Sequence, residues 1–302
     1  MTVARFFAML LLLLLAGCSS EGDQSQIVTE QSGKPALWKV TAKEGTGGTA
    51  WLFGTVHLLP EGTDWQGPLM DEAIRSSDGL VMEVTGLDDQ RAVEGLFSAM
   101  GVNHDMPRLA DRVGASERPG LDKAINAASV PVLTLDNMET WAAALTLSAS
   151  ISDGLGLSRE AGVEQVLQHR YTADQKPVQG LETIQQQFSY FDTLPEKEQR
   201  AMLSVIVEGV GESRTKFQKM LDAWMAGDVD NLLTDANDGL LTSPLIRETL
   251  LDGRNRRWSD AIGKMIDRSE RPFVAVGAGH MVGKGGMPEL LSAKGYVVVR
   301  IQ

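Results

Sequence analysis

Short apolar runs, bounded by glycine, proline and polar residues, divide the chain into strand-like and helix-like segments. Residues 37–40 and 50–53 flank a glycine-rich stretch, a pattern typical of a β-hairpin. Four further apolar runs of strand length lie at residues 79–82, 176–180, 273–276 and 296–299. The intervals between them carry helical spacing, with proline near the expected helix starts. This alternation predicts an α/β fold with a mainly parallel central sheet and flanking helices.

The long middle of the chain lacks strand signals. Residues 196–267 carry apolar residues at helical spacing, so we expect them to be helical and to form a cap on the sheet. The run at 130–135 is compatible with either a strand or the entry to a helix. Trp141, Trp224 and Trp258 lie among Ala, Leu and Met, which is typical of core packing.

The first seventeen residues have the organisation of a bacterial lipoprotein signal peptide. One basic residue, Arg5, precedes an apolar run that is too short for a stable membrane span. Residues 15–18 read Leu-Ala-Gly-Cys, which resembles a lipobox, in which the cysteine becomes the lipidated first residue. Cys18 is the single cysteine of the chain, a usage that favours lipidation over disulfide or metal chemistry. A plain secretory peptide with an incidental cysteine is the alternative.

The lipobox also predicts a location. Ser19 after the cysteine resembles outer-membrane sorting in Gram-negative bacteria. We therefore expect a protein of the bacterial cell envelope, anchored to the membrane through lipid at Cys18, with its domain facing the periplasm. Residues 18–33 are polar and lack apolar periodicity, which predicts a flexible tether. Residues 34–302 are then long enough for one α/β domain with its own core.

The charge of the chain narrows the choice of partner. Removal of residues 1–17 leaves 27 basic and 40 acidic residues, a net charge of −13. Nucleic-acid binding normally needs a basic surface, so we expect no nucleic-acid partner. The acidic balance is adequately explained by solubility.

Two apolar, strand-like runs end in Gly-x-x-His. His57 follows Gly54 at the end of the run 51–54, and His280 follows Gly277 at the end of the run 272–277. His104 has the same spacing from a glycine but lacks the preceding strand. Since imidazoles at the ends of parallel strands lie at one edge of a sheet, the first and last copies predict a shared functional site.

Two carboxylates are predicted at the same edge. Glu83 follows the apolar run 79–82, and Glu182 follows the run 176–180. Two imidazoles and one carboxylate are a recurrent set for divalent ions, so His57, Glu83 and His280 are the expected ligands of zinc, manganese or cobalt. A helix cap or a structural salt bridge is the alternative for either glutamate.

A basic cluster occupies residues 254–258. Arg254 is a candidate for binding a negative charge that develops during a reaction. The alternative without a function is a solvent-exposed basic face of a helix, with Trp258 packed beneath it. His169 resembles a helix-surface residue. The chain has no P-loop, no Gly-x-Ser-x-Gly elbow, no His-Glu-x-x-His and no dinucleotide-binding fingerprint.

Taken together, these motifs resemble the TraB/PrgY/GumN family over about residues 35–302. The resemblance rests on segments 35–40, 51–57, 180–186, 191–195, 254–258 and 277–283. It implies an erythromycin-esterase-like or Tiki-like α/β fold with Gly-x-x-His pairs at the active site. By analogy with the related Tiki metalloproteases it implies a metal-dependent peptidase or other hydrolase. Gly253 stands where many relatives have an acidic residue before Arg-Asn.

Three functional interpretations follow. The first is a lipid-anchored, metal-dependent hydrolase of peptides or small molecules, in which Glu182 moves protons and Arg254 with Asn255 supports the developing charge. The second is a metal-free hydrolase that uses His57 or His280 as general base. The third is a non-catalytic lipoprotein that binds haem or a metal, since a histidine is a common axial ligand of iron.

Overall fold

In a computed structural model of the protein, the structure is described for residues 27, 32–43, 47–232 and 239–302. The apolar runs predicted as strands form one six-stranded sheet. Its strands are β1 (Leu37–Thr41), β2 (Thr49–Thr55), β3 (Gly79–Val84), β4 (Val178–Glu182), β5 (Pro272–Gly277) and β6 (Val297–Arg300). The order across the sheet is β4-β3-β5-β2-β1-β6.

The sheet is mostly parallel, as predicted. β4, β3, β5 and β2 pair in parallel, with Thr55 opposite Gly277 where β2 and β5 end. β1 pairs antiparallel with β2, which confirms the hairpin, and β6 pairs antiparallel with β1 at the far edge. The four parallel strands therefore bring their carboxyl ends to one edge of the sheet, where α/β proteins commonly bind ligands.

Helices connect the strands and account for most of the remaining described chain. The α-helices are α1 (Pro68–Ser76), α2 (Gln90–Gly101), α3 (Arg118–Ala128), α4 (Val132–Asp136), α5 (Thr140–Asp153), α6 (Val163–Ala173), α7 (Ile184–Asp192), α8 (Glu196–Gly209), α9 (Ser213–Ala226), α11 (Pro244–Arg247), α12 (Gly253–Asp267) and α13 (Met287–Ala293). A π-helical turn, Glu248–Asp252, joins α11 to α12, and a 3-10 turn, Ala278–Met281, follows β5.

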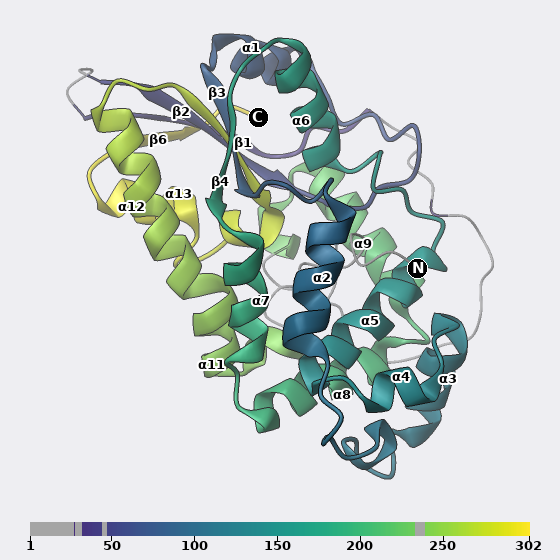
Figure 1. Ribbon diagram of the computed structural model, residues 1–302. Helices are drawn as coiled ribbons and strands as arrows, with labels where there is room; N and C mark the ends of the chain where they lie inside the picture. The colour runs from purple at the N-terminus through teal and green to yellow at the C-terminus, as the bar shows by residue number, and fades with distance from the viewer. Residues whose placement is uncertain (1–26, 28–31, 44–46, 233–238) are drawn as a thin grey trace.

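Helices cover both faces of the sheet. Successive strand residues point to opposite faces, so the apolar strands present an apolar surface on each side. Phe53 on β2 packs with α1, α6 and α9, whereas its neighbour Leu52 packs with α12 and α13. Figure 1 shows α12 and α13 on one side of the sheet and α1 and α6 on the other. The sheet is therefore the middle of three layers, with helices on both faces, as the predicted α/β fold requires.

A third apolar cluster lies beyond the carboxyl ends of the strands. It joins α2, α3, α5, α7 and α8, with an aromatic group of Phe97, Trp141, Phe188 and Phe191 at its centre. Figure 1 shows this helical cap below the sheet. The cap was predicted from residues 196–267 alone, but that segment divides: α8 enters the cap, whereas α9 and α12 cover opposite faces of the sheet.

The structure also bears on the predictions for the run 130–135 and for the N-terminal tether. The ambiguous run 130–135 becomes α4, so the helical alternative holds. The signal peptide, Cys18 and most of the tether lie outside the described residues. Ile27, the first described residue, is buried against the core that contains Trp65 and Trp224. This part of the predicted tether thus contacts the domain.

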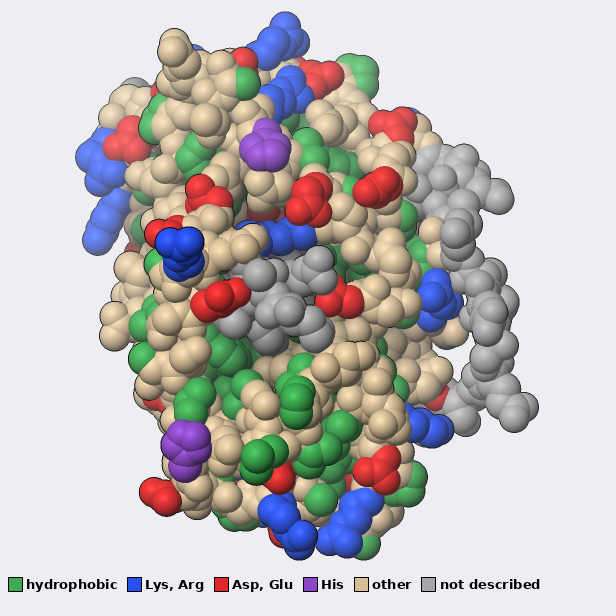
Figure 2. All heavy atoms as spheres, turned by 45° about the vertical axis from the view of Figure 1, so that its right-hand side comes forward, with side chains coloured by type: hydrophobic (Ala, Val, Ile, Leu, Met, Phe, Trp, Pro, Cys, Tyr) green, Lys and Arg blue, Asp and Glu red, His purple; other side chains and the backbone are tan. Residues whose placement is uncertain are grey.

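The surface carries charges of both signs. On the face drawn in Figure 2, acidic and basic side chains are interspersed. Among the helices of the described chain, none is both long enough and apolar enough to cross a bilayer.

Candidate active site at the carboxyl edge of the sheet

The two Gly-x-x-His turns lie side by side. Gly54 on β2 approaches the turn after β5 so closely that an added Cβ would lie 2.9 Å from the Cα of Ala278. Each glycine ends or nearly ends its strand, and the chain then turns and presents a histidine three residues later. The spacing therefore reflects a packing requirement between neighbouring strands as well as the delivery of two imidazoles to one region.

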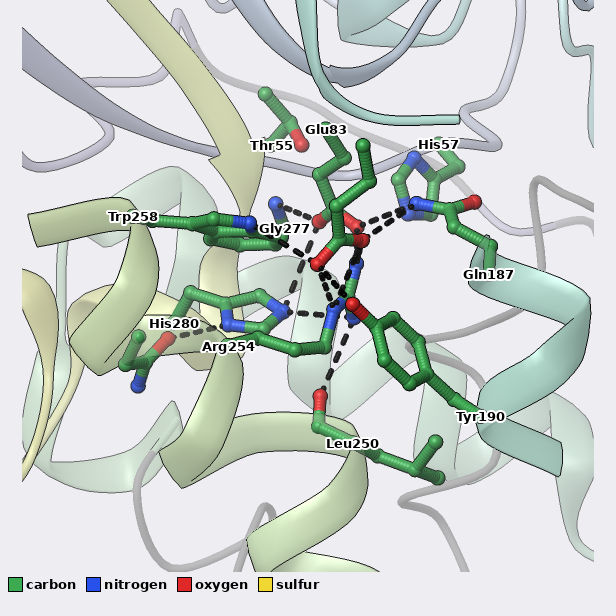
Figure 3. Close-up of polar contacts among 12 residues, drawn as sticks. Thr55, His57, Glu83, Gln187, Tyr190, Leu250, Arg254, Trp258, Gly277 and His280 are labelled. Carbon is green, nitrogen blue, oxygen red and sulfur yellow. Dashed lines mark hydrogen bonds and ion pairs between the residues drawn. The ribbon is translucent and has the colours of Figure 1, made fainter. Parts of the chain in front are cut away.

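Arg254 occupies the centre of this region. Its side chain is fully buried, and its guanidinium forms ion pairs with Glu83 at 2.6 Å and with Glu182 at 2.8 Å (Figure 3). Arg254 comes from the first turn of α12, Glu83 from β3 and Glu182 from the last position of β4. A single guanidinium thus holds two carboxylates that the ends of two parallel strands bring together, the bidentate geometry that arginine favours.

The contacts of Glu182 are completed by aromatic and amide donors. Tyr190 donates its hydroxyl at 2.8 Å and Trp258 its indole N–H at 3.0 Å, both to Oε1. Gln187 lies 3.5 Å from Oε2 and 3.4 Å from Glu83. Both oxygens of Glu182 are therefore bound by donors, an arrangement that favours a structural role over the predicted role in proton transfer.

The electrostatics of the network keep Glu83 ionised. Burial by itself would raise the pKa of Glu83, but the charge of Arg254, those of His280 and His57 when these are protonated, and the N–H of Gly277, 2.8 Å away, outweigh it and lower the pKa to about 2. Burial also opposes the charge of Arg254, yet attraction to the two glutamates raises its pKa.

His280 is held as a neutral imidazole at the edge of this network. The Nδ2 of Asn255 donates to the carbonyl of Gly285, which leaves Oδ1 to accept from His280 Nδ1 at 2.5 Å. Nε2 of His280 faces the guanidinium of Arg254 at 3.4 Å and lies 3.7 Å from Glu83. Burial, reinforced by Arg254 and only partly countered by Glu83, lowers the pKa of His280 to about 3. A base this weak is poorly suited to activating water.

His57 is bound differently. Its Nδ1 donates to Oε1 of Glu164 at 2.5 Å, and the buried hydroxyl of Thr55 donates to the same oxygen. Glu164 lies in the first turn of α6 and belongs to none of the predicted motifs. A carboxylate on Nδ1 fixes both the tautomer and the orientation of an imidazole, as in histidine general bases. We call this hydrogen-bonded pair the His57–Glu164 dyad.

Backbone contacts bring α6 to His57. The N–H of Val163 donates to the carbonyl of Val56 at 3.1 Å. An added Cβ at Gly162 would lie 2.0 Å from the carbonyl oxygen of His57, so only glycine permits this approach. In the sequence, Glu164 resembles the acidic residues that are common in the first turn of a helix. Its partnership with His57 arises from the close contact between these two segments.

The dyad opens onto a pocket with about 50 Å³ of space, enough for more than one water molecule. The pocket is lined by His57, Met82, Glu83, Val84, Leu87, Arg159, Glu164, Gln165, Gln168 and Gln187. Among the described residues, Nε2 of His57 and Oε2 of Glu164 are buried and have no hydrogen-bond partner. Because buried polar atoms are normally satisfied, these two acceptors are suited to a bound donor such as water.

The charge state of His57 also differs from that of His280. Burial lowers the pKa of His57, but the charge and hydrogen bond of Glu164, together with Glu83, outweigh burial and raise the pKa above 6.5. Arg159 acts in the opposite direction. His57 is thus a stronger base than His280, and its buried Nε2 has no partner among the described residues, two properties that suit a general base.

The predicted metal set is not assembled in this geometry. In the part of the chain that the structure describes, no three His, Cys, Asp or Glu side chains are grouped as metal ligands. The guanidinium of Arg254 lies against Glu83 and faces Nε2 of His280, where ligand lone pairs would be needed. His57, Glu83 and His280 as arranged therefore do not fit a divalent ion.

The structure brings all six predicted site residues of the domain to the carboxyl edge of the sheet. His57 and Glu83 line the pocket. Glu182, Arg254, Asn255 and His280 are buried and do not line it, and Figure 3 shows Arg254 and His280 beside Glu83. Sequence reasoning missed Thr55, Glu164, Arg159, Gln187 and Tyr190, whose side chains contact the site or line the pocket. Thr55 lies within the segment 51–57 already singled out, whereas the other four stood in ordinary helix and loop sequence without a signal.

Comparisons with known proteins agree with the motifs. The profile described as "TraB/PrgY/gumN family" matches residues 36–300. The chain is 24% identical over 246 residues, 80% of its length and 86% of the other protein, to a protein of Escherichia coli (strain K12) described as "Uncharacterized protein YbaP". A protein of Shigella flexneri with the same description shows the same identity and coverage. No solved structure matches the chain.

Proposed function

We propose that this chain, which belongs to the TraB/PrgY/gumN family, is a hydrolase of esters or amides in which the His57–Glu164 dyad activates a water molecule. The observation that carries the proposal is that His57 lines the pocket and has a buried Nε2 without a hydrogen-bond partner among the described residues, while its Nδ1 is held by Glu164. A histidine oriented in this way accepts a proton from water as the water oxygen attacks a carbonyl carbon.

The surroundings of the dyad support this chemistry. Proton transfer to Nε2 converts His57 to imidazolium, and both Glu164 and Glu83 stabilise that charge. Glu83 remains ionised because Arg254 and the N–H of Gly277 hold it. Met82, Val84 and Leu87 give the pocket an apolar wall, which suits a small acyl group. The buried network behind the pocket thus supplies a fixed negative charge next to the base.

Metal dependence, the first interpretation from the sequence, stays a prediction. The ligand set as arranged does not favour it, and no contact in the described part of the chain favours haem. A metal-free general-base mechanism requires only groups that line the pocket. Removal of metal by chelation separates these interpretations directly.

The pH dependence of hydrolysis is the test of this proposal. His57 must be neutral to act as base, so we expect the rate to rise with pH through the raised pKa of His57, with a midpoint above 6.5. Glu164→Gln removes the main influence that raises this pKa and leaves burial, which lowers it. We therefore expect the midpoint to shift to lower pH and the plateau rate to fall. The measurement is the hydrolysis of p-nitrophenyl butyrate between pH 5 and 9.

The assay is run on protein that has been exhaustively chelated and on protein reloaded with zinc, manganese or cobalt. Retention of the full rate after chelation supports the metal-free dyad. A rate that appears with one of these ions alone would overturn it in favour of the metal-dependent interpretation. An unchanged midpoint in Glu164→Gln would show that Glu164 does not tune the base.

We also propose that the mature protein is anchored in the bacterial cell envelope by lipid on Cys18. The support is the signal-like segment 1–17 and the lipobox-like residues 15–18. We expect Cys18→Ala to abolish lipid labelling and to move the protein from the membrane fraction to the soluble fraction or to leave it unprocessed. Cys18→Ser, which also lacks the thiol, should behave in the same way. A Cys18→Ala protein that still incorporates labelled fatty acid would contradict the anchor.

A further inference from the structure

Arg159 is the basic residue that lines the pocket of the His57–Glu164 dyad. It belongs to the loop between α5 and α6. Backbone hydrogen bonds join this loop to the loop after β2, on both sides of Arg159 and of His57. Leu59 and Ser158 exchange two backbone hydrogen bonds, at 3.1 and 2.9 Å, and Val163 N–H bonds the carbonyl of Val56. The backbone thus holds the segment that carries Arg159 against the segment that carries His57.

The charge of Arg159 acts within the pocket. Its charge lowers the pKa of His57 and is the smallest of the influences on that pKa, and both residues line the same pocket. Burial lowers the pKa of Arg159, while attraction to Glu160, Glu164 and Asp88 works against this shift. A half-buried guanidinium near a general base interacts more strongly with a new negative charge than an exposed one does.

Arg254, the cation expected from the sequence to support the reaction, is committed elsewhere. It is fully buried, and its guanidinium binds Glu83 and Glu182 and also faces the rings of Trp258 and Tyr190. Two carboxylates already neutralise this charge. A carbonyl oxygen in the pocket therefore needs a different cation.

We propose that Arg159 is a catalytic residue that stabilises the oxyanion formed when the water held by His57 attacks the substrate carbonyl. This inference rests on the proposed hydrolysis. The water oxygen bonds to the carbonyl carbon, its proton passes to Nε2 of His57, and the C=O electron pair moves to the oxygen that faces Arg159. Collapse re-forms the C=O bond, breaks the bond to the leaving alcohol or amine, and returns the proton from His57 to that group.

Steady-state kinetics of variants test the assignment. We expect Arg159→Gln to lower kcat for p-nitrophenyl butyrate by about 10²–10³-fold with little change in KM, since an oxyanion contact is made mainly in the transition state. Arg159→Lys keeps the charge and should retain part of the rate. Rates are compared on the high-pH plateau, because loss of Arg159 also removes an influence that lowers the pKa of His57.

The matched control is Arg170→Gln. Arg170 lies on α6 and pairs with Asp71, outside the residues that line the pocket. We expect this variant to keep the wild-type kcat. Equal rates in Arg159→Gln and wild type, or a raised KM with unchanged kcat, would overturn the oxyanion role.

A binding measurement separates this inference from the proposed function. The phenyl methylphosphonate anion resembles the tetrahedral oxyanion and is not turned over, so its affinity is measured by calorimetry without any activity. We expect Arg159→Gln to weaken its binding at least tenfold, whereas Arg170→Gln leaves it unchanged. Arg159-dependent binding by a protein that hydrolyses no ester would contradict the hydrolase but support an anion site at Arg159. Hydrolysis with phosphonate binding that is independent of Arg159 would overturn this inference alone.

Discussion

His57→Asn is expected to lower kcat for ester hydrolysis by about 10²–10⁴-fold, the usual contribution of a general base. Asparagine retains a donor close to the position of Nδ1, so the contact with Glu164 can persist, while the acceptor at Nε2 is lost. The side chain is 13% exposed and belongs to the pocket wall, so we expect the fold to remain. The measurements are kcat and KM, with circular dichroism and thermal unfolding for the fold.

His104→Asn is the matched control. His104 also follows a glycine by three residues, but it is exposed and lies outside the pocket. We expect wild-type kinetics from this variant. A folded His57→Asn protein with an unchanged kcat would refute the dyad as the source of the base.

Arg254→Met is expected to destabilise the protein by about 3–5 kcal/mol, the usual effect of removing one partner from a buried ion pair. Methionine preserves much of the side-chain length but leaves the carboxylates of Glu83 and Glu182 buried without their shared cation. Arg254→Lys should recover a part of this loss, since an ammonium cannot bind both glutamates in the forked geometry. The measurement is the free energy of unfolding from urea titration.

Arg256→Ala provides the comparison on the same helix. Arg256 forms an exposed ion pair with Glu248, and exposed pairs contribute at most about 1 kcal/mol. We expect its unfolding midpoint to stay close to that of the wild type. A midpoint in Arg254→Met that is as close to wild type would mean that the buried network does not stabilise the fold.

The elements of the sheet were predictable because each strand is a short apolar run between turn residues. The hairpin and the four later runs all became strands, with ends displaced by at most two residues. The helical cap was predictable in kind but not in extent. Residues 90–153 supply much of the apolar surface of the cap, and their helical spacing alone does not indicate which surface they cover.

The site was predictable where strand ends carried the polar residue. Glu83, Glu182 and the two histidines follow apolar runs, and parallel pairing brings such positions together. Their roles were not predictable in the same way. The sequence suggested equivalent histidines, yet His280 binds Asn255 and faces Arg254, whereas His57 binds Glu164 and faces the pocket.

The sequence by itself therefore determined the α/β class, the strands and the set of polar residues at the carboxyl edge, because apolar periodicity and strand ends are local properties of the chain. The tertiary structure decided which cation neutralises the glutamates, which histidine keeps a free nitrogen, and that Glu164 and Arg159 belong to the site. These outcomes depend on backbone contacts such as those of Leu59 with Ser158 and of Val56 with Val163. Such contacts join segments about a hundred residues apart, and no local pattern encodes their register.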